Sequence, residues 1–443
     1  MQHLSIRPIS ILIIMLICQV SFAQPDEKYI NDYNINVALD LIARQFDMNT
    51  QVDIQKKDSS SILEFLLSNY ASINSVCLDN SEIIPFRYSG KDTVVLTLQK
   101  KTRKNVKLHL IFKYTLPADS FKVDKGMFVM KRSDRWYPFQ VGHLFNSRLI
   151  VAVPENQITI SNGKCMKKLL VDHLEKYAWR TKYEHDLSLF IFDPDSMEYK
   201  SENIERTRLN FYFVPGLKDE QKIISLVRSS FIFYSKLIGK YQDRNFTVIE
   251  IPAEWFLGQG LHSFLLFTPV LLKNIPDPRA WVPHEVGHQW IGNIIPIYEQ
   301  AKGFWFVEES LDEYLKAMFV EHEYGSDSLQ HYMSNFYLAN YKANVKNGKD
   351  VSIMDVTSVN NSIEEAQAIY AKGPIILHKL SKCMSDESWT SMIKEIYKNF
   401  QHQLFTLDDF KKCIRRYDHD GHCLKLFNDL LHVKAIPESI RFE

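Results

Sequence analysis

A short histidine motif in the segment from Trp281 to Lys316 constrains both the local structure and the chemistry of the chain. His284 and His288 are four residues apart, so on a helix both imidazoles leave the same face, one turn apart. Two imidazoles in that arrangement can share one small cation. Glu285 follows the first histidine, and its carboxylate can take a proton from a water that the metal activates. The motif therefore predicts a helix that carries two metal ligands and a general base.

The third metal ligand must come from another segment, because a catalytic zinc ion normally has three protein ligands. Glu308 and Glu309, in the acidic helical stretch that follows, are the candidates. With Glu309 as the ligand, apolar Leu311 lies on a core face and Glu313 follows one turn on as a supporting acid. With Glu308 as the ligand, Asp312 would supply that supporting carboxylate. The pattern favours Glu309 and leaves Glu308 open.

The composition is that of a globular chain with two or three domains. At 443 residues the chain is too long for one ordinary core, and hydrophobic residues make up 45% of it. The 53 basic residues balance the 53 acidic ones, so no net charge draws the protein to nucleic acid or to anionic lipid. We expect neither partner.

The first residues have the pattern of a secretory signal peptide. Arg7 gives a positive start, the apolar run ISILIIMLICQV is too short to span a membrane comfortably, and SFA, ending at Ala23, offers small residues for cleavage. An uncleaved anchor helix is the alternative. No second apolar run of spanning length follows. We therefore expect residues 1–23 to be removed and the mature protein to be exported, to the periplasm or outside the cell, with no membrane span.

Five cysteines remain once Cys18 leaves with the signal peptide. No CxxC or Cys/His ligand spacing appears, so the sequence supports neither a disulfide framework nor a structural zinc site. Cys413 and Cys423 could pair within the last helices, with buried free thiols as the alternative. The remaining cysteines are Cys77, Cys165, Cys383, Cys413 and Cys423.

The N-terminal half has the pattern of an antiparallel β-sandwich. From about Tyr29 to Cys165, apolar runs of strand length such as VKLHLIFKYTLP and RLIVAVP are bounded by turn residues. The segment VALDLIARQF is compatible with either a helix or a strand. From Met166 to Arg206 the chain has polar, helix-like sequence, then the strand LSLFIFD, then charged residues, and we place the domain boundary here. The β-sandwich is expected over residues 24–205.

The second half, residues 206–443, has the pattern of a mostly helical domain. It opens with two strands, LNFYFVP and FTVIEIP, separated by a segment whose apolar residues recur at helical spacing. An aromatic and glycine-rich loop, WFLGQGLHSFLLFTP, leads to the histidine motif, and from His284 onward nearly all of the sequence is helical in pattern.

Three motifs resemble those of the aminopeptidase N family of zinc peptidases, which are gluzincins. HEVGHQWIGN is similar to that family's HELAHQWFGN, FVEESLDEYL to its WLNEGFASYL, and YAKGPIILHKL to its YEKGAMVLHML. By motif, His284, His288 and Glu309 match the family's zinc ligands, Glu285 its general base and Tyr370 its oxyanion donor. Weaker sequence similarities, among them RWYPF, ISNGK and FTVIEIP, extend the resemblance over nearly the whole mature chain.

The resemblance implies an α+β multidomain fold, with the N-terminal antiparallel β-sandwich followed by a thermolysin-like, mostly helical zinc-peptidase domain. It also implies bound Zn²⁺ and a peptide or protein substrate. The spacing between His288 and Glu309 is slightly longer than in the family, as a small loop insertion would explain. From the resemblance we expect the chain to end where the family's catalytic domain ends and to lack the large helical domain that follows in many members.

The motif for binding the substrate's amino group departs from the family. The family has GxMEN, whose Glu binds the free amine, whereas this chain has GQGLH with Leu261 at the acid's position. Glu254 lies nearby and is a possible substitute. Trp255, Phe256 and Phe264 would either line an apolar subsite or belong to the core.

We therefore expect a zinc-dependent metallopeptidase, aminopeptidase-like, in which the preference for a free N-terminus is weak or relocated. The alternative is a catalytically weak or inactive protein that grips peptides or a partner on the same scaffold.

Overall fold

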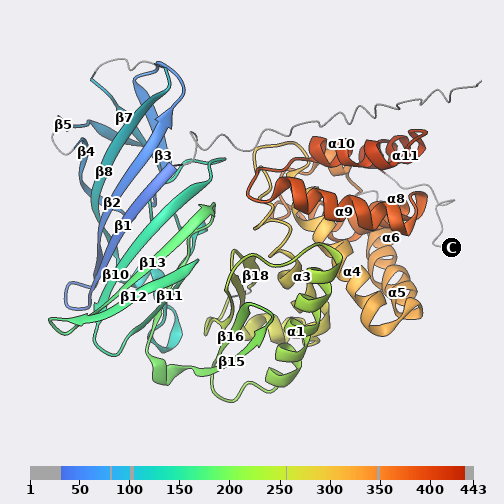
Figure 1. Cartoon of the computed structure of the whole chain (residues 1–443), viewed down its shortest axis with the longest axis horizontal. Coiled ribbons are helices and arrows are strands. Elements are labelled where there is room, and N and C mark those ends of the chain that lie inside the picture. The colour runs from blue at the N-terminus through green and yellow to red at the C-terminus, as the bar shows by residue number, and fades with distance from the viewer. Residues whose placement is uncertain (1–30, 80–81, 100–103, 256, 347–349, 435–443) are drawn as a thin grey trace, which may run out of the picture.

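The computed structural model of the chain describes residues 31–79, 82–99, 104–255, 257–346 and 350–434. A β-rich N-terminal part and a mostly helical C-terminal part lie side by side (Figure 1). This arrangement confirms the expected fold class. The expected signal peptide, residues 1–23, lies outside the described residues. Among the helices that are described, none has the length and apolar character needed to cross a bilayer.

The N-terminal part consists of one large sheet and two small ones. Its strands are β1 Asn31–Asp40, β2 Gln45–Lys56, β3 Ile62–Leu66, β4 Ser72–Leu78, β5 Glu82–Ile83, β6 Phe86–Ser89, β7 Thr93–Thr97, β8 Val106–Pro117, β9 Phe128–Met130, β10 Phe145–Pro154, β11 Ile158–Ser161, β12 Lys164–Val171, β13 Leu174–Glu184 and β14 Leu189–Phe192. The strand order is β12-β13-β10-β1-β2-β8-β4-β5 in the large sheet, and β3-β7-β6 and β11-β14-β9 in the small ones. The pairing is antiparallel as expected, except that β1 runs parallel to β10.

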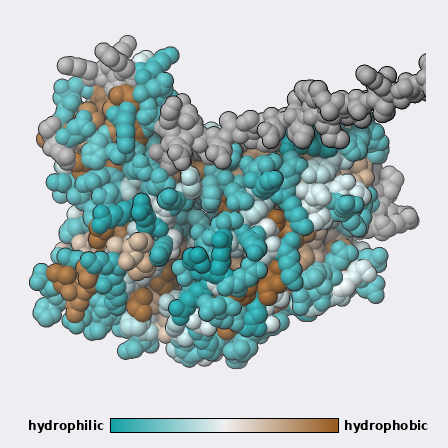
Figure 2. Space-filling view, viewed as in Figure 1, coloured by the Kyte–Doolittle hydropathy of each residue, from teal (hydrophilic) through white to brown (hydrophobic). Residues whose placement is uncertain are grey.

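The ambiguous segment VALDLIARQF forms the end of β1, a tight turn and the start of β2. The Asp40 carboxylate accepts the backbone N–H groups of Ile42 and Ala43, both at 2.8 Å, and Arg44 has a φ of 55°. These local bonds stop the strand and reverse the chain. The apolar side chain of Ile42 is therefore left 98% exposed. Figure 2 shows hydrophobic residues gathered at the lower left of an otherwise largely hydrophilic face, over this β domain.

The polar, helix-like sequence after Met166 is a β-hairpin, so the expectation of a helix there is wrong. β12 and β13 are joined by Asp172 and His173, whose φ angles are 54° and 61°. Two consecutive positive φ angles are typical of the hairpin turn whose twist matches that of the flanking strands. Every residue of β12 is exposed, and its lysines are interspersed with exposed apolar residues such as Met166, Leu169 and Leu170.

The C-terminal part has one five-stranded sheet followed by helices. The sheet has the order β15-β16-β17-β19-β18. From His284 onward the described chain is mostly helical, as expected. The bounds are β15 Glu198–Ile204, β16 Thr207–Phe213, α1 Glu220–Leu237, β17 Asn245–Glu250, β18 Gly258–Leu261, β19 Phe264–Phe267, α2 Pro269–Asn274, α3 Val282–Gly287, α4 Leu311–Tyr324, α5 Ser326–Tyr332, α6 Ala339–Lys346, α7 Ile363–Gln367, α8 Gly373–Cys383, α9 Asp386–Phe400, α10 Leu407–Tyr417 and α11 His422–His432.

The domain boundary expected at residue 205 falls just after β15. This strand pairs with β16 and so belongs to the sheet of the C-terminal part, which begins at Glu198. The charged residues that follow LSLFIFD are thus an exposed edge strand and not a linker.

Helix α1 supports the histidine helix from behind. Its apolar residues Val227, Phe231 and Tyr234 are buried, as their helical spacing predicts. The Tyr234 hydroxyl donates a hydrogen bond of 2.9 Å to the carbonyl oxygen of Pro283, in the first turn of α3. The core of the C-terminal part thus fixes the position of the helix that carries the histidines.

The two parts share a hydrophobic cluster and a buried ion cluster. Phe190 of the N-terminal part packs with Phe264 of the C-terminal part, at a ring-centroid distance of 5.0 Å. His262 lies between two carboxylates, with Nδ1 2.9 Å from Glu184 Oε2 and Nε2 2.9 Å from Asp243 Oδ2. Burial lowers the pKa of His262, but the two carboxylates outweigh burial and raise it well above its usual value. A protonated histidine therefore bridges the two parts.

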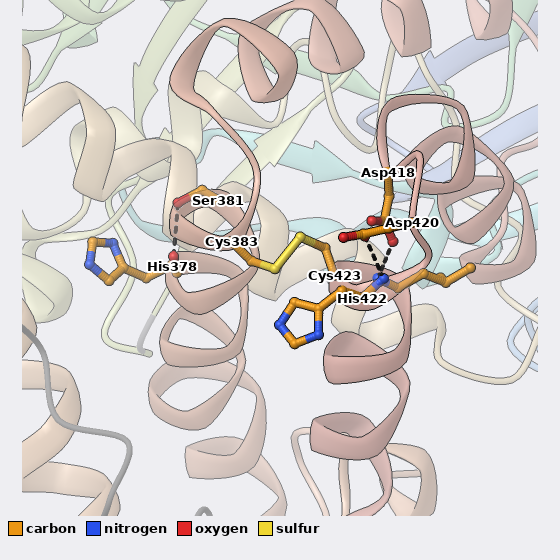
Figure 3. The surroundings of a disulfide bond; sticks show 8 residues. His378, Ser381, Cys383, Asp418, Asp420, His422 and Cys423 are labelled. Atoms are coloured by element: carbon orange, nitrogen blue, oxygen red, sulfur yellow. Dashed lines mark hydrogen bonds between the residues drawn. A yellow bond between two sulfur atoms is a disulfide. The ribbon is translucent and has the colours of Figure 1, made fainter.

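One disulfide joins the end of α8 to the start of α11 (Figure 3). It pairs Cys383 with Cys423, whose Cα atoms are 5.6 Å apart. The suggested pairing of Cys413 with Cys423 is therefore wrong, and Cys413 is a buried free thiol of α10. The start of α11 is also held by the carboxylate of Asp418, which accepts the backbone N–H of Leu424 at 2.7 Å.

Removing this disulfide should destabilise the protein. A bond that closes a loop between residues 40 positions apart typically contributes about 2–4 kcal/mol. We expect Cys383→Ser to lower the melting temperature by roughly 5–15 °C, as measured by differential scanning fluorimetry. Cys165→Ser, which removes an exposed free thiol, is the control and should leave the melting temperature unchanged. Alkylation of Cys423 in the unreduced, denatured protein would contradict the pairing.

Candidate metal centre

Three side chains converge at the C-terminal end of α3. His284 Nε2 and His288 Nε2 are 3.2 Å apart, and Glu309 Oε2 lies 3.3 Å from the first and 3.5 Å from the second. Ligand bonds of about 2.0–2.1 Å in a tetrahedral site place neighbouring ligand atoms about 3.3 Å apart. The three atoms therefore fit a small divalent cation such as zinc. Among the described residues, His284, His288 and Glu309 are the histidines and acids that lie close enough together to hold one metal ion.

The structure places the two candidate carboxylates differently. Glu308 and Glu309 share a π-helical turn, Phe306–Ser310, that precedes α4. Glu309 faces the histidines, whereas Glu308 lies against Gly292 and lines a pocket beside them. A Cβ atom at Gly292 would lie 2.6 Å from Glu308 Oε1, and Gly292 has a φ of 103°. Glycine is therefore required at this contact.

Two acids on α4 lie behind His284. Its Nδ1 is 2.9 Å from Glu313 Oε2 and 3.2 Å from Asp312 Oδ2, so both residues considered as supporting acids are present. Burial lowers the pKa of His284, but its contacts with Glu309 and Glu313 outweigh burial and raise it to about 10. The surroundings of the histidine thus favour positive charge, as a metal site requires.

The glycine of the histidine motif makes this approach of α4 possible. A Cβ atom at Gly287 would lie 2.0 Å from Asp312 Oδ1. A side chain at Gly287 would collide with the Asp312 carboxylate, so glycine leaves room for this acid behind His284. Glu313 is held in turn by the Tyr337 hydroxyl, which donates to Oε1 at 3.1 Å, and by an ion pair with Lys316.

Glu285 is buried between α3 and the edge strand β18. Burial raises the pKa of its carboxyl group, and the two histidines oppose that effect. The strand approaches closely because it contains Gly258 and Gly260. A Cβ atom at Gly260 would lie 2.5 Å from the carbonyl oxygen of Glu285, and one at Gly258 would lie 3.0 Å from Glu285 Oε1. The glycines of GQGLH thus let a strand form one wall of the site.

The polar residues that follow the histidines hold this strand. Gln289 Nε2 donates to the carbonyl oxygens of Leu261 and Phe264, at 2.9 and 3.0 Å, and its Oε1 accepts the N–H of Ser263. Asn293 Nδ2 donates to the carbonyl oxygen of Gly260 at 3.3 Å. The sequence interpretation gave these two residues no role, although their place within the quoted motif HEVGHQWIGN was a signal.

Tyr370 lies above the three converging side chains. Its ring centroid is 6.2 Å from that of His284, and its hydroxyl hydrogen-bonds with Glu309. Burial and the Glu309 carboxylate raise the pKa of Tyr370 well above its usual value, so the hydroxyl remains a donor. Tyr370 belongs to a second π-helical turn, Ala368–Lys372, and this turn is joined to the first by Ser310 Oγ, which donates to the carbonyl oxygen of Ile369 at 2.7 Å.

A pocket of about 180 Å³ opens beside the metal ligands, between the two parts of the chain. From the C-terminal part it is lined by Gln259, Leu261 and Glu308, among others. From the N-terminal part it is lined by Arg132 and by the loop that carries His185 and Asp186. The sequence interpretation missed these N-terminal residues, because they lie far from the histidine motif in the chain.

The other residues considered around GQGLH have separate positions. Leu261 is 3% exposed and packs with Phe264 in the shared hydrophobic cluster, so Phe264 belongs to the core. Glu254 and Trp255 are exposed and do not line the pocket. Phe256 lies outside the described residues. The described positions therefore give no support to Glu254 as a substitute acid or to an apolar subsite made by these aromatic residues.

Comparisons with known proteins find similarity to zinc metallopeptidases. Residues 272–432 match the model of the Peptidase family M1 domain. Aminopeptidase 2, mitochondrial, of Saccharomyces cerevisiae is 22% identical over 284 residues, which cover 60% of this chain and 29% of that protein. The M1 zinc metallopeptidase of Deinococcus radiodurans superposes with a TM-score of 0.71 at 13% identity, over 92% of this chain and 94% of the other. A mutant of that enzyme bound to a Tyr-Ser-Ala substrate gives a TM-score of 0.70 at the same identity.

The three converging side chains should bind about one zinc ion per chain, because their spacing fits its tetrahedral coordination. We expect His284→Ala to lose the zinc, as measured by inductively coupled plasma mass spectrometry on dialysed protein. His173→Ala is the control, since its side chain is 94% exposed and far from the site in sequence. A folded wild-type protein that takes up no added zinc would refute the assignment.

Proposed function

Because its M1 domain and two-part fold place this chain in the aminopeptidase N-like gluzincin family, we propose that it is a zinc-dependent metallopeptidase that hydrolyses peptide or protein substrates. The observation that carries the proposal is the convergence of three ligand atoms, a buried carboxylate and a tyrosine hydroxyl at one place. Binding alone would require neither Glu285 nor Tyr370 beside the metal ligands. The match spans less than a third of the yeast aminopeptidase, so the activity is proposed from the site.

His284, His288 and Glu309 would hold the zinc ion. When bound, zinc would polarise the substrate carbonyl and make a water molecule acidic enough to lose a proton near neutral pH. Glu285 would accept that proton, and its buried position, which raises the pKa of the carboxyl group, makes it a stronger base. Tyr370 would donate a hydrogen bond to the carbonyl oxygen as negative charge develops there.

We further propose that the amine-binding site differs from that of the relatives. Leu261 occupies the position of the family's amine-binding acid, and its side chain is apolar and buried. Glu254 is exposed and outside the pocket. A preference for a free N-terminus must therefore be weak or come from other residues.

Export of the protein is part of the same proposal. The signal-peptide pattern in residues 1–23 motivates it. The disulfide between Cys383 and Cys423 supports it, because such bonds persist mainly in oxidising compartments.

Glu285→Gln should keep the zinc ion and lose the base. We expect kcat to fall by about 100- to 10,000-fold, with one zinc per chain retained. The measurement is mass spectrometry of a peptide library digested with equal amounts of wild-type and variant protein. Full activity in the variant would remove Glu285 from the mechanism. Peptides recovered intact from stoichiometric wild-type protein would instead favour a binding protein on this scaffold.

Tyr370→Phe should keep both the zinc ion and the substrate affinity, because the ring remains and only the hydroxyl is lost. We expect kcat to fall by about 100- to 1000-fold, as for the loss of one oxyanion donor, with KM little changed in steady-state kinetics on one cleaved peptide. Tyr298→Phe, a tyrosine at the pocket rim whose hydroxyl contacts Gln300, is the control. An equal loss in both variants would contradict the specific role of Tyr370.

A further inference from the structure

We propose that His185 and Asp186 form a subsite for a cationic group of the substrate, in the pocket beside the metal ligands. This inference rests on the proposed peptidase function and names the residues of the N-terminal part that select the substrate. Both residues line the pocket, as do Gln259, Gly260 and Leu261 of β18. Neither has been assigned a role by the metal site or by the motifs around it.

The loop that carries these residues is held in one conformation from its own side. Glu184 Oε1 accepts the backbone N–H groups of His185 and Asp186, both at 2.9 Å. The carbonyl oxygen of Leu187 accepts the indole N–H of Trp136 at 3.1 Å, and the N–H of Leu187 donates to the Tyr137 hydroxyl at 3.3 Å. The segment RWYPF, which contains this Trp and Tyr, therefore positions the loop.

Asn162 joins the loop to the residue that follows β18. Asn162 Nδ2 donates to the carbonyl oxygen of Asp186 at 3.0 Å and to that of His262 at 2.8 Å. Its Oδ1 accepts the N–H of Ser188 at 2.6 Å. His262 directly follows β18, so the ISNGK segment fixes the width of the pocket between the two parts. The pocket wall is thus rigid, as a specific binding site requires.

Two polar atoms of this fixed loop are left without a hydrogen bond. Asp186 Oδ1 and His185 Nδ1 are buried and make no hydrogen bond to any described residue. The His185 ring hydrogen-bonds the backbone of Gly292, and burial lowers its pKa to about 4, so the ring is neutral at pH 7. A neutral ring that donates at one nitrogen accepts at the other. The Asp186 carboxylate accepts the backbone N–H of Arg132, and its Oδ1 remains an acceptor whose burial is costly unless a donor reaches it.

The charge of the pocket favours a positively charged donor. Apart from the metal ligand Glu309, the pocket is lined by Asp186, Glu299 and Glu308, and the one Lys or Arg among its lining residues is Arg132. The guanidinium of Arg132 pairs with Glu299. Arg132 also acts on Asp186, but its pairing with Glu299 offsets its charge, so Asp186 is left as a carboxylate that attracts cations and repels anions.

Two substrate groups have this chemistry. One is the α-ammonium of a free N-terminus, and the other is the side chain of a lysine or arginine next to the cleaved bond. Both would donate charge-assisted N–H bonds to Asp186. The experiment distinguishes them.

The test is isothermal titration calorimetry in the zinc-loaded Glu285→Gln background, in which the probes are not consumed. The probes are leucine amide, N-acetyl-leucine amide and N-acetyl-lysine amide. We expect at least one cationic probe to bind about ten- to a hundredfold more tightly than N-acetyl-leucine amide, as for one charge-assisted bond. Tighter binding of leucine amide identifies the α-ammonium, and tighter binding of N-acetyl-lysine amide identifies the side chain.

In the Glu285→Gln protein, the further change Asp186→Asn should abolish the tighter binding of the cationic probe. The affinity for N-acetyl-leucine amide should stay unchanged. Adding Glu254→Gln, which neutralises an exposed acid outside the pocket, is the matched control and should preserve the tighter binding. Equal affinity of the Glu285→Gln protein for all three probes would overturn the proposal. So would an equal loss of affinity for all three probes when Asp186→Asn is added. Failure of the proposed function shows separately, as wild-type protein that discriminates the probes but leaves a peptide library uncut.

Discussion

The contact between His284 and the acids of α4 is the interaction on which the site depends. One ring nitrogen of His284 faces Glu309 and His288, and the other faces Asp312 and Glu313. A buried imidazole contacted on both sides has a fixed orientation, so the ligand set exists only while α3 and α4 stay at this distance. Gly287 has no side chain and so leaves room for the Asp312 carboxylate between the two helices. Metal binding therefore depends on how α3 and α4 pack against each other.

Close contacts at glycines also occur at two other places around the metal ligands. Gly260 lets the edge strand β18 touch the backbone of α3, and Gly373 lets the helix after Tyr370 touch Ser310, where a Cβ atom would lie 2.0 Å from the hydroxyl oxygen. The first contact holds β18 against Glu285, and the second holds the turn that carries Tyr370 against the turn that carries Glu309. The rigidity of such backbone contacts preserves the geometry that catalysis requires.

The sequence was sufficient where the determinants are local. His284, Glu285 and His288 lie within two turns of one helix, so their spacing alone predicts their convergence. The preference for Glu309 over Glu308 followed from the pattern of the next helix, and the structure turns Glu309 toward the histidines. The role of Tyr370 depended on a family resemblance, since nothing in its own neighbourhood distinguishes it from the chain's other tyrosines.

Other features escaped prediction, because they depend on contacts between distant segments or on unusual backbone angles. The pairing of Cys383 with Cys423 follows from how α8 and α11 pack. The hairpin at Asp172 and His173 depends on two positive φ angles in residues that commonly adopt negative ones. Asp186 reaches the pocket only because one part of the chain docks on the other.

This docking has a consequence for each half as a separate chain. The cluster that contains Phe190 and Phe264 and the bridge from His262 to Glu184 both cross between the two parts. Separation would expose that apolar surface to water and leave a charged imidazole without one of its counterions. Each half produced alone is therefore expected to be less stable and more prone to aggregate than the same residues within the whole chain.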